Sequence, residues 1–121
     1  MANRRLFISQ PMRDMTKEEI LEDRQKYLED AIQRAGEPLD LIDTFFDDDL
    51  SKKKKYKKLT KLLTVGNEPE IRLLPIFYLV KSIELLATAD YAYFAPEWSN
   101  YRGCIVEHSV AREYGISILR D

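Results

Sequence analysis

The sequence predicts a single α/β domain over residues 1–121, in which helices cover both faces of a parallel sheet. Short apolar segments alternate along the chain with longer segments of helical periodicity, which is the pattern of parallel α/β proteins. The 121 residues are the length of one ordinary domain, and 45% hydrophobic with 33% charged residues is typical of a globular chain. We see no repeat or linker that would divide it.

The first predicted unit is a strand, a loop and a helix. Leu6-Phe7-Ile8 is short and apolar, and the polar segment Ser9–Asp14 follows as a loop. Thr16 and Glu19 have the spacing of a capping box, which predicts the start of a helix. That helix is expected to end at Ala35-Gly36, since glycine favours the position after a last helical turn.

A second strand is predicted over Leu39–Phe46, so that strand, helix and strand form a right-handed parallel crossover. The acidic run Asp47–Asp49 and the lysine-rich run Lys52–Lys58 come next. A solvated surface helix accounts for them, because acidic residues before lysines suit a helix dipole. A basic patch for nucleic acid or a polyphosphate is the other interpretation. The net charge of −2 favours the surface helix, so nucleic acid is not an expected partner.

The rest of the chain predicts two further helix–strand units. A helix starts near Pro75 and leads to a buried strand at Tyr91–Ala95, and a second helix runs from about Arg102 to Gly115 before a last strand at Ile116–Leu119. The residues that recur at three and four, and so indicate that second helix, are Ile105, Val106, Ser109, Val110 and Tyr114.

Wound in this way, the units give a three-layer α/β/α sandwich of the flavodoxin or Rossmann type, with four to five parallel strands in the order 2-1-3-4. The loops after strands 1 and 3 then flank one crevice, which is where open α/β sheets bind ligands. Backbone N–H groups, arginines and aromatic rings there suit a sugar hydroxyl, an anion or a stacked base. The candidate ligand-binding residues are Ser9, Gln10, Pro11, Met12, Arg13, Trp98, Ser99, Tyr101, Arg102 and Gly103.

Two motifs at opposite ends of the chain resemble one family, the nucleoside 2-deoxyribosyltransferase-like proteins, and in particular its branch of small bacterial and phage domains. The first, Leu6–Met12, is similar to that branch's first strand and loop, which usually ends in Ser-Gly-Pro-Met. The second is similar to the family's closing motif and comprises Asp90, an apolar strand, Trp98, Arg102-Gly103, Glu107-His108, Ala111 and Gly115.

The resemblance implies a nucleoside or nucleotide ligand and a catalytic role for Glu107, which would attack the anomeric carbon of the sugar. A separate acid must protonate the departing base, and Asp90 and Asp43 are the candidates from the sequence. A helix-dipole partner, or an ion pair with Arg102, is the other interpretation of Glu107.

The chain departs from the family pattern at two positions. Gln10 replaces a glycine, which puts the close approach of the backbone in doubt, and Tyr101 replaces a serine that helps to hold phosphate in monophosphate-cleaving relatives. Two hypotheses stay open. One is an N-glycosyl hydrolase or deoxyribosyltransferase, and the other is a non-catalytic protein that sequesters or senses a nucleotide.

The remaining expectations come from what the sequence lacks. Cys104 is the single cysteine and His108 the single histidine, so we expect no disulfide, no metal site and no cofactor, with Cys104 packed as a small apolar residue. Without an apolar run near the roughly 20 residues of a membrane span or a signal-peptide core, the chain is expected in the cytoplasm. We also expect a homo-oligomer, since relatives of this fold commonly assemble.

Overall fold

The structure is a computed structural model that describes residues 2–44 and 73–121. Its strands are parallel throughout, and helices join them in the predicted alternation. In chain order the elements are β1 Arg4–Ser9, α1 Lys17–Ala35, β2 Leu39–Leu41, α3 Leu73–Leu86, β3 Tyr91–Phe94, the 3-10 turn η2 Trp98–Asn100, α4 Arg102–Glu113 and β4 Ser117–Arg120.

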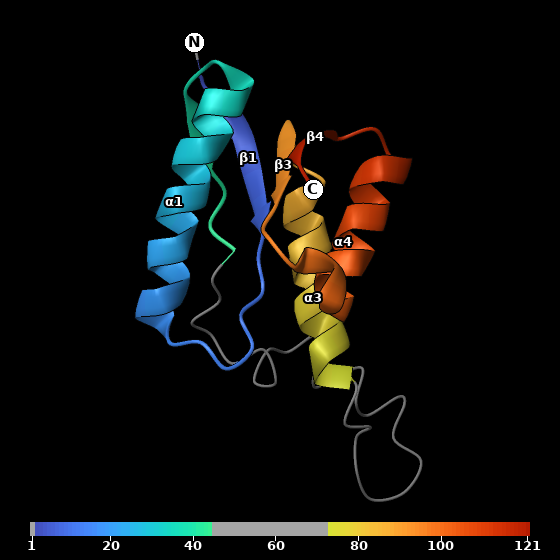
Figure 1. The fold of residues 1–121 in the computed structure, drawn as a ribbon. Helices are drawn as coiled ribbons and strands as arrows, with labels where there is room; N and C mark the ends of the chain where they lie inside the picture. The colour runs from blue at the N-terminus through green and yellow to red at the C-terminus, as the bar shows by residue number, and fades with distance from the viewer. Residues whose placement is uncertain (1, 45–72) are drawn as a thin grey trace, which may run out of the picture.

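The sheet has the order β2-β1-β3-β4, which confirms the predicted strand order and the parallel α/β sandwich. Helix α1 covers one face of the sheet, and α3 and α4 lie together on the other (Figure 1). Because all four strands run the same way, their carboxyl ends meet at one edge of the sheet. Strand β1 is central, so the loop after it opens at the middle of that edge.

The alternation of side chains along β1 divides the core into two layers. Leu6 and Ile8 point to the α1 side and pack with Ala31, whereas Phe7 points to the other side and packs with Leu86 and residues of β3 and α4. All three β1 side chains are fully buried. Burial on both faces explains why the sequence of this strand is uniformly apolar.

The ends of the helices follow the predicted local chemistry. Thr16 accepts a hydrogen bond from the Glu19 backbone, and the Glu19 side chain accepts one from the Thr16 backbone, so the capping box is confirmed. Gly36 ends α1 with a φ of 71°, in the left-handed region that glycine adopts without steric cost. Gly115, just after α4, has a φ of 77°.

The second strand is shorter than predicted. Regular pairing with β1 covers only Leu39–Leu41, although the Ile42 backbone still donates to Leu6 at 2.9 Å. Phe45 and Phe46, which the prediction included in this strand, lie outside the described residues, as do the acidic run and the lysine run 52–58.

The predicted helix is confirmed as α4, but of the residues whose recurrence indicated it only Val110 packs against the core. Ile105 and Val106 are exposed, and Tyr114 is 82% exposed, whereas the buried side chains are Cys104, Glu107 and Ala111. At 3.6 residues per turn, the buried side is centred roughly 140° around the helix axis from the recurring residues. The apolar pattern does not reveal this side, because it counts glutamate as a surface residue, whereas α4 turns the carboxyl group of Glu107 inward.

Within residues 2–44 and 73–121, no helix has both the length and the apolar character that crossing a membrane requires.

Candidate active site

A pocket of about 250 Å³ opens at the carboxyl edge of the sheet, beside the end of the central strand β1. Its walls come from β1 and the loop after it, from α3, and from the start of α4. This is the crevice at which open α/β sheets bind ligands. The lining residues are Phe7, Ile8, Ser9, Gln10, Pro11, Met12, Thr44, Pro75, Tyr78, Leu79, Ser82, Tyr101, Gly103, Cys104 and Glu107.

Glu107 is the buried acidic group of this pocket. It lies in the second turn of α4, is 8% exposed, and its Oε1 accepts a 2.8 Å hydrogen bond from Ser9 Oγ at the end of β1. Burial raises the pKa of Glu107 from 4.5 to about 7, and the Ser9 hydrogen bond opposes part of that rise. The carboxyl group therefore exchanges its proton near neutral pH, as groups that transfer protons or attack a substrate often do.

The helix-dipole and ion-pair interpretations of Glu107 find no support in this geometry. The first turn of α4 contains no acidic residue, and dipole effects fall off beyond that turn. The partner of Glu107 is Ser9, while Arg102 is exposed to solvent.

Cys104 lies one turn before Glu107 on the same face of α4 and is buried at the pocket wall. Burial raises the pKa of the thiol, the hydrogen bond with Ser9 lowers it, and the neighbouring Glu107 raises it further. The thiol accordingly stays protonated at neutral pH, in the packing role that the sequence predicts rather than as a nucleophile.

The side chain of Gln10 is held by α1. Its Oε1 accepts a 2.8 Å hydrogen bond from Arg24 Nε, and its Nε2 donates to the Ile20 carbonyl at 3.1 Å. Arg24 is 3% exposed, and burial lowers its pKa while Asp43 raises it. The Gln10 amide is thus held by hydrogen bonds to α1. Sequence reasoning missed its partner Arg24, because an arginine among the other charged residues of a helix gives no signal.

The two arginines expected to bind an anion do not line the pocket. Arg13 and Arg102 are both exposed and lie outside its walls, although Gly103, next to Arg102, is part of them. No arginine or lysine lines the pocket within the described part of the chain. The anion-binding clamp expected from Arg13 and Arg102 is therefore not formed, because both side chains extend from the rim of the crevice into solvent.

Trp98, a predicted stacking residue, is engaged with another ring. It stacks on His108 with ring centroids 4.1 Å apart at 17°, and His108 Nε2 lies 3.0 Å from Asp121 Oδ2. Neither Trp98 nor the exposed Ser99 lines the pocket, so Tyr101 is the predicted aromatic residue that does.

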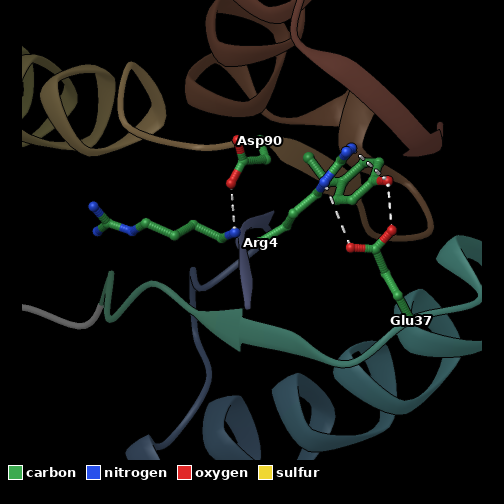
Figure 2. A network of polar contacts seen from close by, with 5 residues as sticks. Arg4, Glu37 and Asp90 are labelled. Atoms are coloured by element: carbon green, nitrogen blue, oxygen red, sulfur yellow. Dashed lines mark hydrogen bonds and ion pairs between the residues drawn. The ribbon is translucent and has the colours of Figure 1, made fainter. Parts of the chain in front are cut away.

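The structure does not bring Asp90 to the site. Its Oδ2 accepts a 2.8 Å hydrogen bond from the Arg5 backbone at the amino edge of the sheet, as Figure 2 shows. Ser9 is four residues further along β1 than Arg5, a distance of roughly 13 Å. Asp90 precedes β3 rather than following it, so it lies at the opposite edge from Glu107 and cannot protonate a group held there.

Asp43 is at the correct edge but on the wrong face of the sheet. Its side chain is 84% exposed, and its Oδ1 lies 4.0 Å from Arg24 Nη1 on the α1 side. Among the described residues, Glu107 is therefore the one carboxyl group that lines the pocket.

Sequence reasoning missed the wall that α3 contributes. Pro75, Tyr78, Leu79 and Ser82 line the pocket, but their helical spacing reads as an ordinary core stripe. Thr44 was also missed, because it falls inside a predicted strand and belongs to no motif. No group of three or more His, Cys, Asp or Glu side chains suited to a metal ion occurs in residues 2–44 and 73–121.

Comparisons with protein-family models, with curated proteins and with solved structures found no match. The resemblance to nucleoside 2-deoxyribosyltransferase-like proteins therefore rests on the two motifs quoted above and stays a prediction.

Proposed function

We propose that the chain binds a nucleoside in the pocket at the carboxyl edge and cleaves or exchanges its N-glycosidic bond, with Glu107 as the nucleophile. The observation that carries this proposal is the buried carboxyl group of Glu107, held by Ser9 at the wall of a pocket beside the central strand. A carboxylate that attacks an anomeric carbon needs this kind of confined position.

In the proposed reaction, a Glu107 oxygen forms a bond to the anomeric carbon as the bond from that carbon to the base nitrogen breaks. The electron pair leaves with the base, and water or a second base then displaces the glutamate from the sugar. Ser9 keeps the carboxyl group in one orientation through Oε1. Only the ionised carboxylate attacks, so a pKa of about 7 makes the rate rise with pH through neutrality.

A neutral nucleoside suits the pocket better than a nucleotide. No cationic side chain lines the described walls, and the ionised form of Glu107 would repel a phosphate. Tyr101 also favours a nucleoside over a nucleotide, because its bulky side chain stands where monophosphate-cleaving members of the resembled family have a phosphate-binding serine.

Non-catalytic nucleoside or nucleotide binding is the second candidate, and one specific observation favours it. A retaining glycosidase pairs its nucleophile with an acid whose carboxyl group is about 5–5.5 Å away. The described walls contain no second carboxyl group, since Asp90 and Asp43 both lie elsewhere. Without an acid in that position, a departing base must take its proton from water.

A homo-oligomer is also part of the proposal. Ile76 and Val80 on α3 and Ile105 and Val106 on α4 are exposed apolar side chains on two helices that contact each other. Association would bury them. Light scattering at micromolar concentration tests this, and a monomer would contradict it. Cytoplasmic location stays a prediction from the sequence.

The experiment is a binding and turnover assay on wild type, Glu107→Gln and Glu113→Gln, which removes an exposed carboxylate from the same helix. The four common 2′-deoxynucleosides and their 5′-monophosphates are titrated by calorimetry, and chromatography detects released base. We expect wild type and Glu113→Gln to bind and release base, and Glu107→Gln to bind without release. Binding without release by wild type would leave the non-catalytic function, and no binding at all would contradict both.

A further inference from the structure

We propose that Thr44 is a second ligand-contacting residue of the pocket, whose hydroxyl group pairs with an uncharged polar atom of the bound nucleoside. The inference rests on the proposed ligand but not on the proposed reaction. It holds equally for a binding protein and for an enzyme.

Thr44 lies three residues after Leu41, the last residue of β2. Strands β1 and β2 pair Arg4 with Leu39 and Leu6 with Leu41, and the Ile42 backbone continues the ladder by donating to Leu6. Beyond this ladder, Thr44 comes to the wall of the same pocket as Ser9.

Thr44 and Ser9 each follow a residue of the same core layer. Phe7 and Ile42 belong to the core layer between the sheet and α3 and α4, and Ser9 and Thr44 are each two residues further along. Glu107, Ser9 and Thr44 all line this one pocket, with 2.8 Å between Ser9 Oγ and Glu107 Oε1.

The buried hydroxyl group of Thr44 lacks a hydrogen-bond partner among the described residues. Thr44 is 5% exposed, and its Oγ1 has no hydrogen-bond partner among the residues that the structure describes. A buried hydroxyl without a partner destabilises a folded protein, and the great majority of such groups are paired. At the wall of a pocket, a ligand atom is the natural partner.

The other unpartnered buried group, Arg24 Nη2, does not share this site. Arg24 contacts Gln10 and Asp43 from the α1 side of the sheet, and it does not line the pocket. Glu107, Ser9 and Thr44 therefore present hydroxyl groups and one carboxyl group to the pocket, without a cation.

This chemistry selects the kind of ligand atom. A threonine hydroxyl both donates and accepts, so its partner is a hydroxyl, a carbonyl or a ring nitrogen. With the anomeric carbon at Glu107, the sugar hydroxyls and the polar atoms of the base are the ligand atoms left to contact Thr44. The shared requirement is one neutral hydrogen-bonding atom, which the sugar or the base can supply.

The test uses Thr44→Val, which replaces the hydroxyl with a methyl group of similar size, together with Thr44→Ser, which keeps a hydroxyl. Thr88→Val is the matched control, because Thr88 makes its hydrogen bond to Leu85 on the exposed end of α3. The probes are 2′-deoxyadenosine and thymidine, titrated by calorimetry. We expect Thr44→Val to bind about three- to tenfold more weakly than wild type, with Thr44→Ser near wild type and Thr88→Val unchanged.

The melting temperature without ligand gives a second measurement. Thr44→Val should melt no lower than wild type, since it removes an unpartnered hydroxyl. A lower melting temperature that Thr44→Ser restores would overturn the inference, because the hydroxyl would then support the fold. Equal affinity of Thr44→Val and wild type would overturn the inference about Thr44 and leave the proposed function standing. A wild type that binds neither probe would contradict the proposed function as well.

Two analogues identify the ligand atom. 2′,5′-Dideoxyadenosine and 2′,3′-dideoxyadenosine each lack one more sugar hydroxyl than 2′-deoxyadenosine. The analogue that Thr44→Val and wild type bind equally lacks the partner of Thr44. If the substitution weakens both analogues to the same extent, the partner is on the base.

Discussion

The two edges of the sheet carry polar groups in opposite arrangements. At the amino edge, Arg4 Nε lies 3.6 Å from Glu37 Oε1, the Tyr91 hydroxyl donates to Glu37 Oε2 at 3.3 Å, and Asp90 accepts from the Arg5 backbone (Figure 2). These groups satisfy one another and keep contact with water. Such an arrangement joins strands without exposing a reactive group.

The carboxyl edge has fewer and more deeply buried polar groups. Glu107 has Ser9 as its hydrogen-bond partner and a raised pKa, while Thr44 Oγ1 has no partner among the described residues. Buried polar groups that are poorly satisfied lower stability, and proteins retain them mainly where a ligand uses them. Asp90 is therefore a carboxylate that holds the sheet together, whereas Glu107 is the carboxylate proposed to react.

The largest expected difference between the edges is in turnover. Glu107→Gln should lower base release by on the order of 10⁴-fold or more, because an amide cannot form the glycosyl ester. Asp90→Asn should leave release within about twofold of wild type, since it lies roughly 13 Å from the site. Chromatographic assay of both variants on the nucleoside that wild type cleaves measures this, and a comparable loss in the Asp90 variant would remove the distinction.

The second difference is in the pH dependence of stability. Burial raises the pKa of Glu107 to about 7 in the folded state, above its ordinary 4.5, so the folded protein binds a proton that the unfolded chain releases between these values. Its contribution to stability is complete below pH 4.5 and is lost as the pH rises through about 7. The loss is roughly 3 kcal/mol.

Glu107→Gln should not show this loss, so its stability relative to wild type should increase between pH 5 and pH 8. Urea unfolding of both proteins at several pH values measures the change, and Glu113→Gln serves as the control with no such trend. A constant difference between Glu107→Gln and wild type would show that the Glu107 carboxyl group is as well solvated in the folded protein as in the unfolded chain.

Removing the Asp90 side chain should affect stability alone. Asp90→Ala loses the acceptor of a charged hydrogen bond to the Arg5 backbone at an exposed site, and the expected cost is about 1 kcal/mol. Ligand affinity should not change. Denaturant unfolding and calorimetric titration of the same sample check both statements, and a weaker affinity would link the two edges.

The smallest effect is expected at the exposed ion pair. Glu37→Ala removes the partner of Arg4, whose side chain is largely exposed, and should lower the free energy of unfolding by about 0.2–1 kcal/mol. The difference from wild type should shrink in high salt, since added ions screen exposed charges. An effect that persists in high salt would instead assign the contribution to the Tyr91–Glu37 hydrogen bond.

The sequence by itself determined the parts of the fold that depend on local chemistry. The apolar segments around Phe7 and Ala92, the capping box at Thr16 and the glycine after α1 each predict an element that the structure contains. Their alternation also predicted the order 2-1-3-4, because right-handed crossovers leave few ways to wind such a chain. Ser9, Gly103 and Glu107 were correctly expected near one crevice, since the ends of strands 1 and 3 meet there.

Only the tertiary structure decided which polar residues share that crevice. Asp90 lies at the far edge because it enters β3 instead of leaving it, and the rotation of α4 about its axis turned Glu107 inward and Ile105 outward. Ser82 came to the pocket through the packing of α3, and Thr44 through the path of the chain after β2; both depend on contacts between residues far apart in the chain. Burial and the choice of hydrogen-bond partner are properties of these long-range contacts, so local sequence patterns contain no record of them.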